Sequence, residues 1–142
     1  MTSPGPRLNL GLLLRRSHQR AATSLNAALE PLGITGRHFG VMMLLRRAGT
    51  STQRDLIRLT GSDKAGMTRT VEDLENLGYL SRTRSTHDKR VTDLQLTSEG
   101  SAAFDKAREL AAGVAESLFG SFTAGELETL ESLLTRFVEH DH

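Results

Sequence analysis

Apolar side chains recur at helical spacing from Leu8 to about Glu30, which predicts a long first helix that ends at Pro31 and Gly33. The residues on its apolar face are Leu10, Leu14, Ala21, Leu25 and Ala28. A second helix follows in the run GRHFGVMMLLRRAG, with Thr35 as its N-terminal cap and Gly49 at its end. Because this helix is apolar on most sides, we expect it to be central.

Two further helices are predicted directly after Gly49. Ser51 or Thr52 caps the short run QRDLIRLTG, and the residues expected to face inward are Leu56, Ile57 and Leu59. Ser62 then opens the run DKAGMTRTVEDLENLG. The apolar stripe of this fourth helix consists of Met67, Val71, Leu74 and Leu77, ahead of a stop at Gly78.

After Gly78 the apolar period changes from helical to alternating. The runs YLSRTR and VTDLQLT have strand character, and the polar STHDKR between them predicts the turn of a hairpin. Thr97 caps a helix from Ser98 to Phe119, Gly120 breaks it, and Thr123 begins a last helix. The last helix has an apolar side made of Leu127, Leu130, Leu134 and Val138.

This order of elements predicts a mainly α fold with a small β-hairpin and about six helices. Residues 1–142 form a single domain, and residues 35–97 have the order of a helix-turn-helix lobe followed by a hairpin wing. The four per cent of aromatic residues and the Leu-rich pattern also favour a helical interior over a sheet.

The composition excludes several classes of function. The chain has no cysteine, so thiolate catalysis, disulfides and Cys-ligated zinc are excluded. No Gly-rich phosphate loop, nucleophile elbow or paired-carboxylate motif is present, so we expect no enzyme, no cofactor and no metal site. No apolar run approaches the roughly 20 residues of a membrane span, and MTSPGPR is not a signal peptide. We therefore expect a cytoplasmic protein without a membrane partner.

Charge is distributed unevenly along the chain although its net value is only +1. Residues 37–90 carry 11 Lys and Arg against 6 Asp and Glu, a balance of +5, whereas residues 98–142 carry 3 against 9, a balance of −6. A chance fluctuation is one explanation of this asymmetry. The other is a nucleic-acid surface in the basic middle of the chain.

The predicted fourth helix has the polarity that DNA requires. Ala65, Thr68 and Arg69 lie opposite its apolar stripe, Lys64 flanks them, and the carboxylates come later in the helix. A recognition helix enters the major groove by its N-terminal end, although an ordinary amphipathic helix with a solvated face has the same pattern. With the hydroxyls and N–H groups before it, the candidate DNA contacts are Ser51, Thr52, Gln53, Ser62, Lys64, Ala65, Thr68 and Arg69.

The hairpin tip collects a second group of cations. Arg82 and Arg84 share a face of the first strand, and Asp88 is placed to hold Arg90 in a charge-assisted pair. The tip suits the minor groove or flanking phosphates, and the alternative is a hairpin that faces only water. The candidate DNA contacts of the wing are Arg82, Arg84, His87, Lys89 and Arg90, and it stays open whether His87 contacts a phosphate or only water.

The run DKAGMTRTVEDLENLGYLSRTRSTHDKRVTDLQLTSEG resembles the recognition helix and wing of the MarR family of bacterial transcription regulators. The pattern D-x-R-x-x-x-L-x-L-T-x-x-G falls on Asp88, Arg90, Leu94, Leu96, Thr97 and Gly100. PLGITGRHFGVMMLL and STQRDLIRLTG are similar to the second and third helices of the family. Gly66 departs from the family, since many relatives have a hydroxyl or a larger residue there; either DNA approaches closely at Gly66 or one contact is missing.

The resemblance implies a homodimer that binds a pseudo-palindromic operator in double-stranded DNA, most commonly as a repressor. Residues 8–30 and 98–142 would then be dimerisation helices, which agrees with their Leu stripes. An alternative from another class is a winged helix that binds a protein.

The resemblance also implies an effector, because many family members release DNA when a small aromatic acid binds. Arg15, His18 and His38 are the residues that could hold its carboxylate. The alternatives are a core histidine bonded to a backbone carbonyl with an arginine at the surface, and a regulator without any effector.

Overall fold

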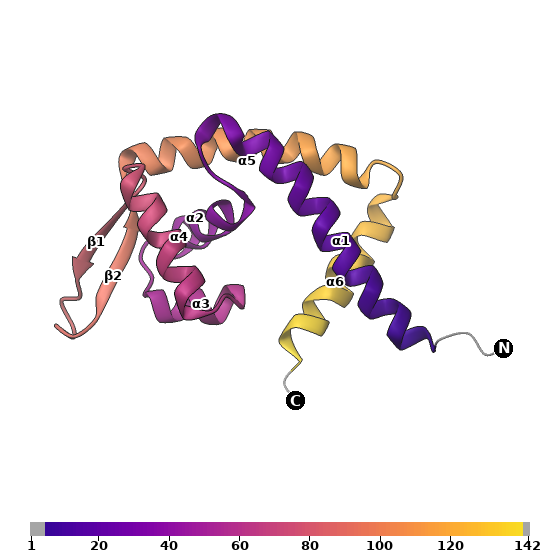
Figure 1. The fold of residues 1–142 in the computed structure, drawn as a ribbon, viewed down its shortest axis with the longest axis horizontal. Coiled ribbons are helices and arrows are strands. Elements are labelled where there is room, and N and C mark those ends of the chain that lie inside the picture. Colours follow the sequence, from indigo (N-terminus) through magenta and orange to yellow (C-terminus); the bar gives the residue numbers. More distant parts are fainter. Residues whose placement is uncertain (1–4, 141–142) are drawn as a thin grey trace.

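The computed structural model describes residues 5–140 and confirms the predicted mainly α fold with one antiparallel hairpin (Figure 1). None of the helices in this part of the chain combines the length and apolar character needed to cross a membrane. The elements are α1 (Pro6–Leu29), the 3-10 turn η1 (Glu30–Leu32), α2 (Gly36–Ala48), α3 (Gln53–Thr60), α4 (Lys64–Asn76), β1 (Leu80–Arg84), β2 (Thr92–Leu96), α5 (Ser98–Phe119) and α6 (Ala124–Glu139).

The lobe and the long helices occupy different parts of the molecule. Figure 1 shows α2, α3, α4 and the hairpin gathered at one end of α5, while α1 packs along α5 and α6 follows at its other end. The hairpin tip and the α3–α4 junction project from the side of the lobe opposite α5. That side is therefore open to a large partner.

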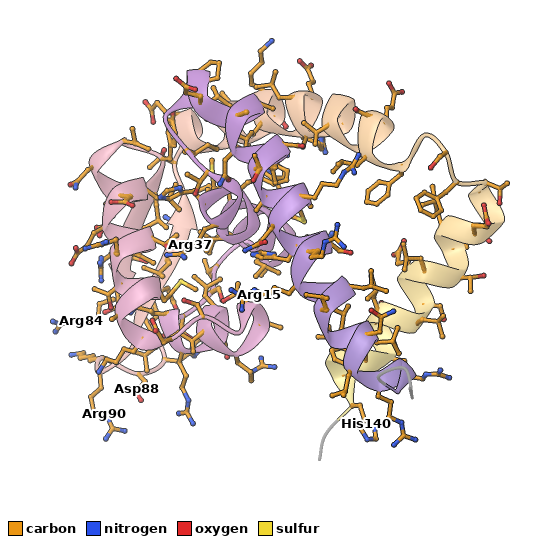
Figure 2. All side chains as sticks on the ribbon, turned by 45° about the vertical axis from the view of Figure 1, so that its right-hand side comes forward. Arg15, Arg37, Arg84, Asp88, Arg90 and His140 are labelled. Carbon is orange, nitrogen blue, oxygen red and sulfur yellow. The ribbon has the colours of Figure 1, made fainter. Side chains whose placement is uncertain are left out.

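The terminal helices bury little within one chain. Among the described residues α6 has no buried side chain, and Figure 2 shows side chains projecting all along α1 and α6. An apolar groove of about 560 Å³ runs along this region, lined by Phe119, Leu127, Leu130, Leu134 and Val138 among others. The most exposed large apolar residues of α1 and α6 are Leu8, Leu10, Leu12, Leu13, Leu133, Phe137 and Val138.

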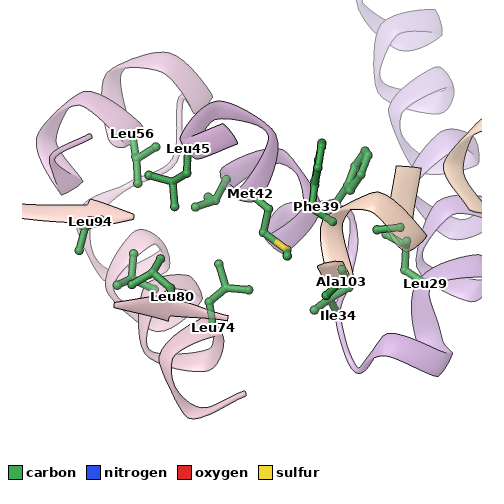
Figure 3. Close-up of a cluster of buried hydrophobic side chains, with 14 of the residues drawn as sticks. Leu29, Ile34, Phe39, Met42, Leu45, Leu56, Leu74, Leu80, Leu94 and Ala103 are labelled. Carbon is green, nitrogen blue, oxygen red and sulfur yellow. The ribbon is translucent and has the colours of Figure 1, made fainter. Parts of the chain in front are cut away.

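The core lies inside the lobe and at its junction with α1 and α5 (Figure 3). Met42 and Leu45 of α2 are fully buried among residues from the other lobe elements, which confirms that α2 is central. The stacked rings of Phe39 and Phe104, 5.4 Å apart between centroids, extend this core to α5. The remaining buried residues include Leu29, Ile34, Leu56, Met67, Val71, Leu74, Leu80, Leu94, Ala103 and Ala107.

Two residues expected to face inward are exposed. Leu59 is 53% exposed because it lies on the opposite side of Leu56 from Ile57, beyond the buried arc of a short helix. Leu77 is 40% exposed because α4 ends at Asn76, so the stripe formed by Met67, Val71 and Leu74 does not continue to it.

Helix starts follow the predicted caps with one exception. The hydroxyls of Thr52, Thr97 and Thr123 accept the backbone N–H groups of Asp55, Gly100 and Glu126 at 3.1, 2.9 and 3.1 Å. The prediction that Ser62 opens α4 is wrong. Asp63 is the cap, since its carboxylate accepts the N–H of Gly66 at 2.6 Å, while the hydroxyl of Ser62 donates to the carbonyl of Asp63.

The hairpin is fixed to the lobe by its register and by an isolated bridge between Ser51 and β2. Leu80 pairs with Leu96 at the base of the hairpin and Arg82 with the buried Leu94, while Arg84 pairs with Thr92 nearer the tip. The backbone of Ser51 bonds Leu94 in both directions, at 3.0 and 2.7 Å. The segment before α3 is therefore hydrogen-bonded to the second strand of the wing.

Candidate nucleic-acid interface

The outer face of α4 carries the predicted recognition residues. Lys64, Ala65 and Arg69 are exposed, Met67 is buried on the opposite face, and Thr68 is half-buried toward α3. The buried stripe and the Asp63 cap hold this helix with its N-terminal turns outward. Among the described residues, Lys64 and Arg69 form no ion pair, so both charges are available to a polyanion.

Gly66 has a local explanation in the cap of α4. A Cβ at this position would lie 2.9 Å from Oδ1 of Asp63 and 3.1 Å from the hydroxyl of Ser62. The missing side chain therefore leaves room for the cap. The same Cβ would lie 3.9 Å from Nη1 of Arg37, so this guanidinium reaches the start of the recognition helix. The sequence pattern did not indicate Arg37, because it simply follows the first residue of another helix.

The start of α3 uses several of its predicted contact groups inside the chain. The N–H of Ser51 bonds Leu94, and the hydroxyl of Thr52 caps α3. The amide Nε2 of Gln53 donates to Oγ1 of Thr68 at 2.8 Å, which links α3 to α4. Two predicted DNA contacts are thus brought together, which the sequence did not predict because nothing in it marks a pair 15 residues apart.

The wing tip presents its cations as the sequence predicted. Arg84, His87, Lys89 and Arg90 are exposed, and Figure 2 shows Arg84 and Arg90 at the hairpin end of the molecule. Asp88 accepts from the backbone N–H of Arg90 at 3.0 Å, from its Nε at 3.2 Å and from its Nη2 at 3.4 Å. These bonds hold the pKa of the Asp88 carboxyl below its usual value.

Arg82 differs from the other arginines of the wing. Its Nε and Nη2 contact Oε1 of Glu75 at 2.8 and 2.7 Å, at the end of α4. The hydrogen bond to Glu75 and the charge of that carboxylate raise the pKa of Arg82 despite partial burial. Arg82 therefore ties β1 to the recognition helix within the chain, in addition to the DNA contact predicted for it.

The three candidate effector residues have different surroundings. Arg15 and His18 lie on the exposed part of α1 and have no hydrogen-bond or ion-pair partner within residues 5–140. Nδ1 of His38 accepts the N–H of Thr35 at 2.9 Å, and its Nε2 lies 2.9 Å from Oδ2 of Asp73. His38 therefore already has a partner on each ring nitrogen and joins α2 to α4.

Arg46 links the lobe to α5, a role that the sequence pattern does not predict. Its Nη2 donates to the carbonyl and hydroxyl of Ser101 at 2.8 and 3.0 Å and to Asp105 at 2.9 Å. Its guanidinium carbon lies 4.9 Å from the centre of the Phe104 ring. The only available signal was its place in the last turn of a central helix, where a cation suits the helix dipole.

Across the part of the chain that the structure describes, no three His, Asp or Glu side chains come close enough to hold a metal ion. What the lobe offers is a set of exposed cations on α4 and on the wing tip, both on the side opposite α5 (Figure 1). This arrangement suits a rod-like polyanion.

Comparison with known proteins places the chain among regulators of transcription. The model of the MarR family matches residues 32–91, which cover the lobe up to the wing tip. The chain is 31% identical over 128 residues to the multiple antibiotic resistance protein MarR of Escherichia coli, covering 89% of each chain. It is also 31% identical over 133 residues to the transcriptional repressor NicR of Pseudomonas putida, covering 93% of this chain and 84% of NicR.

A solved structure shows the same fold on DNA. The crystal structure of a mutant of Escherichia coli MarR complexed with operator DNA matches with a TM-score of 0.83 at 31% identity. The match covers 91% of this chain and 93% of the other.

Proposed function

The chain belongs to the MarR family of operator-binding transcriptional regulators, and from that premise we propose that it is a homodimeric repressor of a pseudo-palindromic operator. Residues 35–97 form the DNA-binding lobe in this proposal, and residues 8–30 and 98–142 supply the dimer interface. Two lobes related by a two-fold axis contact half-sites about one helical turn, roughly 34–36 Å, apart.

The observation that carries the DNA-binding proposal is the exposed face of α4 beside the wing, whose Lys64 and Arg69 form no ion pair with any described residue. Lys64, Ala65 and Arg69 read the major groove, while Arg84, Lys89 and Arg90 contact the minor groove or flanking phosphates. Asp88 holds the backbone and guanidinium of Arg90, which orients this cation without burying it.

The homodimer is supported by the terminal helices. A 16-residue helix such as α6, with none of its described side chains buried, has little to stabilise it in a lone chain. The groove lined by Leu127, Leu130 and Leu134 lies on this exposed surface, and a second copy of the chain would cover it.

The experiment that tests this proposal is selection of bound duplexes from a random-sequence pool by the full-length chain. We expect an enriched inverted repeat with half-sites one helical turn apart, and a dimer to duplex ratio of one in the complex. Failure to enrich any sequence would contradict the proposal and favour a winged helix that binds a protein.

Two alanine variants separate base contacts from phosphate contacts on the selected duplex. Arg90→Ala should weaken binding to all sequences and lower the slope of log affinity against log salt by about 0.9. Arg69→Ala should also relax the base preference at one position of each half-site. The proposal that α4 and the wing bind DNA is wrong if neither variant changes the mobility shift.

A second candidate function is release of DNA by a small aromatic acid. Arg15 and His18 on α1 support it, since neither has a partner within residues 5–140 and both are available for a carboxylate. His38 is the weakest of the three proposed effector residues, because both of its ring nitrogens have partners in the chain.

Measurement of operator affinity with and without phenolic carboxylates tests the effector proposal. A bound acid must prefer a dimer whose lobes are wrongly spaced, because equal affinity for both states shifts nothing. We expect affinity to fall in the presence of the acid and Arg15→Ala to lose this response. An unchanged response in Arg15→Ala would remove that residue from the site.

A further inference from the structure

Thr68 differs from the other threonines whose hydroxyls bond within the described helices. Thr60, Thr70 and Thr129 donate their hydroxyl hydrogens to the carbonyls four residues earlier, at 2.7, 2.9 and 3.0 Å. Thr68 instead accepts a hydrogen bond from Nε2 of Gln53 at 2.8 Å. Within residues 5–140 its own hydroxyl hydrogen has no acceptor.

This pattern fixes the hydrogen-bonding polarity of the Thr68 hydroxyl. A hydroxyl has one hydrogen and two lone pairs, and the hydrogen rotates to suit its partners. Because the Gln53 amide occupies a lone pair on the α3 side, the hydrogen is directed away from α3. Thr68 therefore presents a donor at the surface of the recognition helix.

We propose that Gln53 is a positioning residue that makes Thr68 select a hydrogen-bond acceptor on an operator base. This inference rests on the proposed operator binding by α4. In the major groove the acceptors are N7 and O6 of guanine, N7 of adenine and O4 of thymine, whereas the amino groups of cytosine and adenine are donors. Thr68 contacts a base and so contributes to base preference. Gln53 determines that Thr68 donates a hydrogen bond in this contact, and Gln53 itself contacts no base.

The position of Thr68 favours a base edge over a phosphate. It lies in the second turn of α4 between the exposed Ala65 and Arg69, on the part of a recognition helix that contacts bases. Its side chain is short and half-buried against α3, so it reaches only atoms close to the helix. Phosphates along the groove edges are reached by longer side chains, such as those of Arg84 and Lys89 in the wing.

Three substitutions alter this pair in different ways. Thr68→Val keeps the shape and removes the donor. Gln53→Glu replaces an amide donor with a carboxylate that only accepts, so the Thr68 hydrogen turns toward α3 and its lone pairs face the DNA. Gln53→Met keeps the length of the side chain and leaves the Thr68 hydroxyl free to rotate. Thr129→Val is the matched control, because it makes the same change outside the lobe, at an exposed residue of α6 that does not line the apolar groove.

The experiment begins with the duplex that the wild-type chain selects from a random-sequence pool. Each base-edge acceptor of one half-site is then deleted in turn, using 7-deazaguanine, 7-deazaadenine, 2-aminopurine and 5-methyl-2-pyrimidinone. Affinity for every modified duplex is measured for all five proteins by fluorescence anisotropy. Thermal unfolding of each variant establishes that it is folded.

We expect one acceptor deletion to weaken wild-type binding by roughly 3- to 10-fold, as the loss of a single hydrogen bond implies. Thr129→Val should show the same sensitivity, and Thr68→Val and Gln53→Glu should show none at that position. Gln53→Met should keep only part of it. In repeated selection, Gln53→Glu should change the preferred base to one that presents an amino group.

Two results would overturn the inference. One is a set of acceptor deletions that affect wild type and Thr68→Val equally, which would make Thr68 a phosphate contact or no contact. The other is unchanged base preference in Gln53→Glu. Both differ from failure of the proposed function, in which the wild-type chain enriches no duplex at all.

Discussion

Two carboxylates near the wing hold arginines in different ways, and the difference decides which arginines stay available to DNA. Glu75 binds Arg82 through Nε and Nη2 at the end of α4, where both side chains are only about one-third exposed (37% and 31%). Asp88 binds Arg90 at the tip, where the arginine side chain remains 91% exposed. One pair fastens the wing to the lobe, and the other orients a cation toward solvent.

The Asp88 pair predicts a measurable shift in the pKa of one carboxyl. Hydrogen bonds from the Arg90 side chain and backbone lower the Asp88 pKa, so Asp88 should titrate below the usual value of about 3.9. Because the folded-state pKa is the lower one, the pair stabilises the tip above the unfolded pKa, and this contribution disappears as pH falls through the folded pKa.

Carboxyl titration followed by NMR checks this prediction. The Asp88 pKa should rise in Arg90→Ala, where both side-chain bonds are lost and the backbone bond alone remains. Arg84→Ala serves as the control, since Arg84 forms no ion pair in the described part of the chain and should leave the Asp88 pKa unchanged. An Asp88 pKa that is the same in wild type and Arg90→Ala would contradict the oriented pair.

Arg82 and Arg84 share a face of β1 but should respond differently to substitution. Arg84→Ala should lower the salt slope of DNA binding by about 0.9, because a free guanidinium neutralises a phosphate. Arg82→Ala should lower the melting temperature more than Arg84→Ala does, because it leaves Glu75 without its partner. Salt titrations and thermal melts on both variants check this; an equal loss of salt slope would make Arg82 a DNA contact as well.

At the scale of elements, the junction between the hairpin and α5 explains the L-x-L-T-x-x-G pattern. Thr97 donates its hydroxyl to the carbonyl of Gly78 at 2.6 Å and accepts the N–H of Gly100 at 2.9 Å. Its backbone N–H bonds the carbonyl of Tyr79 at 3.0 Å. The first turn of α5 is thereby held against the turn that follows α4.

Gly100 is the point of closest approach in this junction. A Cβ there would overlap the carbonyl oxygen of Tyr79 and lie 2.7 Å from its carbonyl carbon. Backbone cannot move aside as a flexible side chain can, so Gly100→Ala should destabilise the fold by about 3 kcal/mol or more. Gly40→Ala, with no atom within 4 Å of its added Cβ, should instead stabilise α2 by up to about 1 kcal/mol.

Denaturant unfolding of the two glycine variants measures both effects. The close packing of α5 on Tyr79 would be contradicted if Gly100→Ala and Gly40→Ala had the same free energy of unfolding. In Gly100→Ala the hairpin should also become disordered at a lower denaturant concentration than the rest of the lobe, because β2 leads directly into this junction. Gly40→Ala should not show this difference.

Local signals in the sequence predicted the elements well, because caps and periodicity depend on neighbouring residues. Thr52, Thr97 and Thr123 cap helices as expected, but two adjacent cap residues, Ser62 and Asp63, could not be distinguished. Helical spacing also could not predict that Leu59 is exposed. In a helix of eight residues, the side that becomes buried depends on which other elements pack against the helix.

The sequence predicted which single residues of the candidate site are exposed cations, but it did not predict which residues of the site contact one another. The exposed cations of α4 and the wing followed from spacing and charge. The Gln53–Thr68, Arg82–Glu75 and His38–Asp73 contacts did not, because each joins two elements whose packing is set by the core and not by any local pattern. The place of His38 at the start of α2 predicts an effector ligand, whereas in the structure both of its ring nitrogens have partners within the chain.

At the scale of the whole molecule, the exposed apolar surface and the exposed cations of the lobe lie at opposite ends. The lobe exposes cations on α4 and on the wing, while α1 and α6 at the other end of the molecule expose apolar side chains such as Leu8, Leu133 and Phe137 (Figure 1). A dimer formed through the terminal helices buries the apolar surface and keeps both basic lobes free for DNA.

The dimer predicts that stability depends on protein concentration. Because folding and association are coupled in such an interface, the melting temperature should rise with concentration, and sedimentation should give a single species of about twice 15.5 kDa. Leu134→Glu places a charge in the apolar groove next to Glu131 and should shift the chain toward monomer.

Leu59→Glu is the matched control for this prediction, because Leu59 is also a leucine exposed on a helix but lies on α3, outside the terminal helices. It should sediment as wild type does. Leu134→Glu should also lose cooperative binding to the two half-sites while a single lobe still binds one half-site weakly, because α4 and the wing are unchanged. If both variants remained dimers of wild-type stability, the apolar surface of α6 would not be the interface, and the exposed leucines of α1 would have to bind the second copy alone.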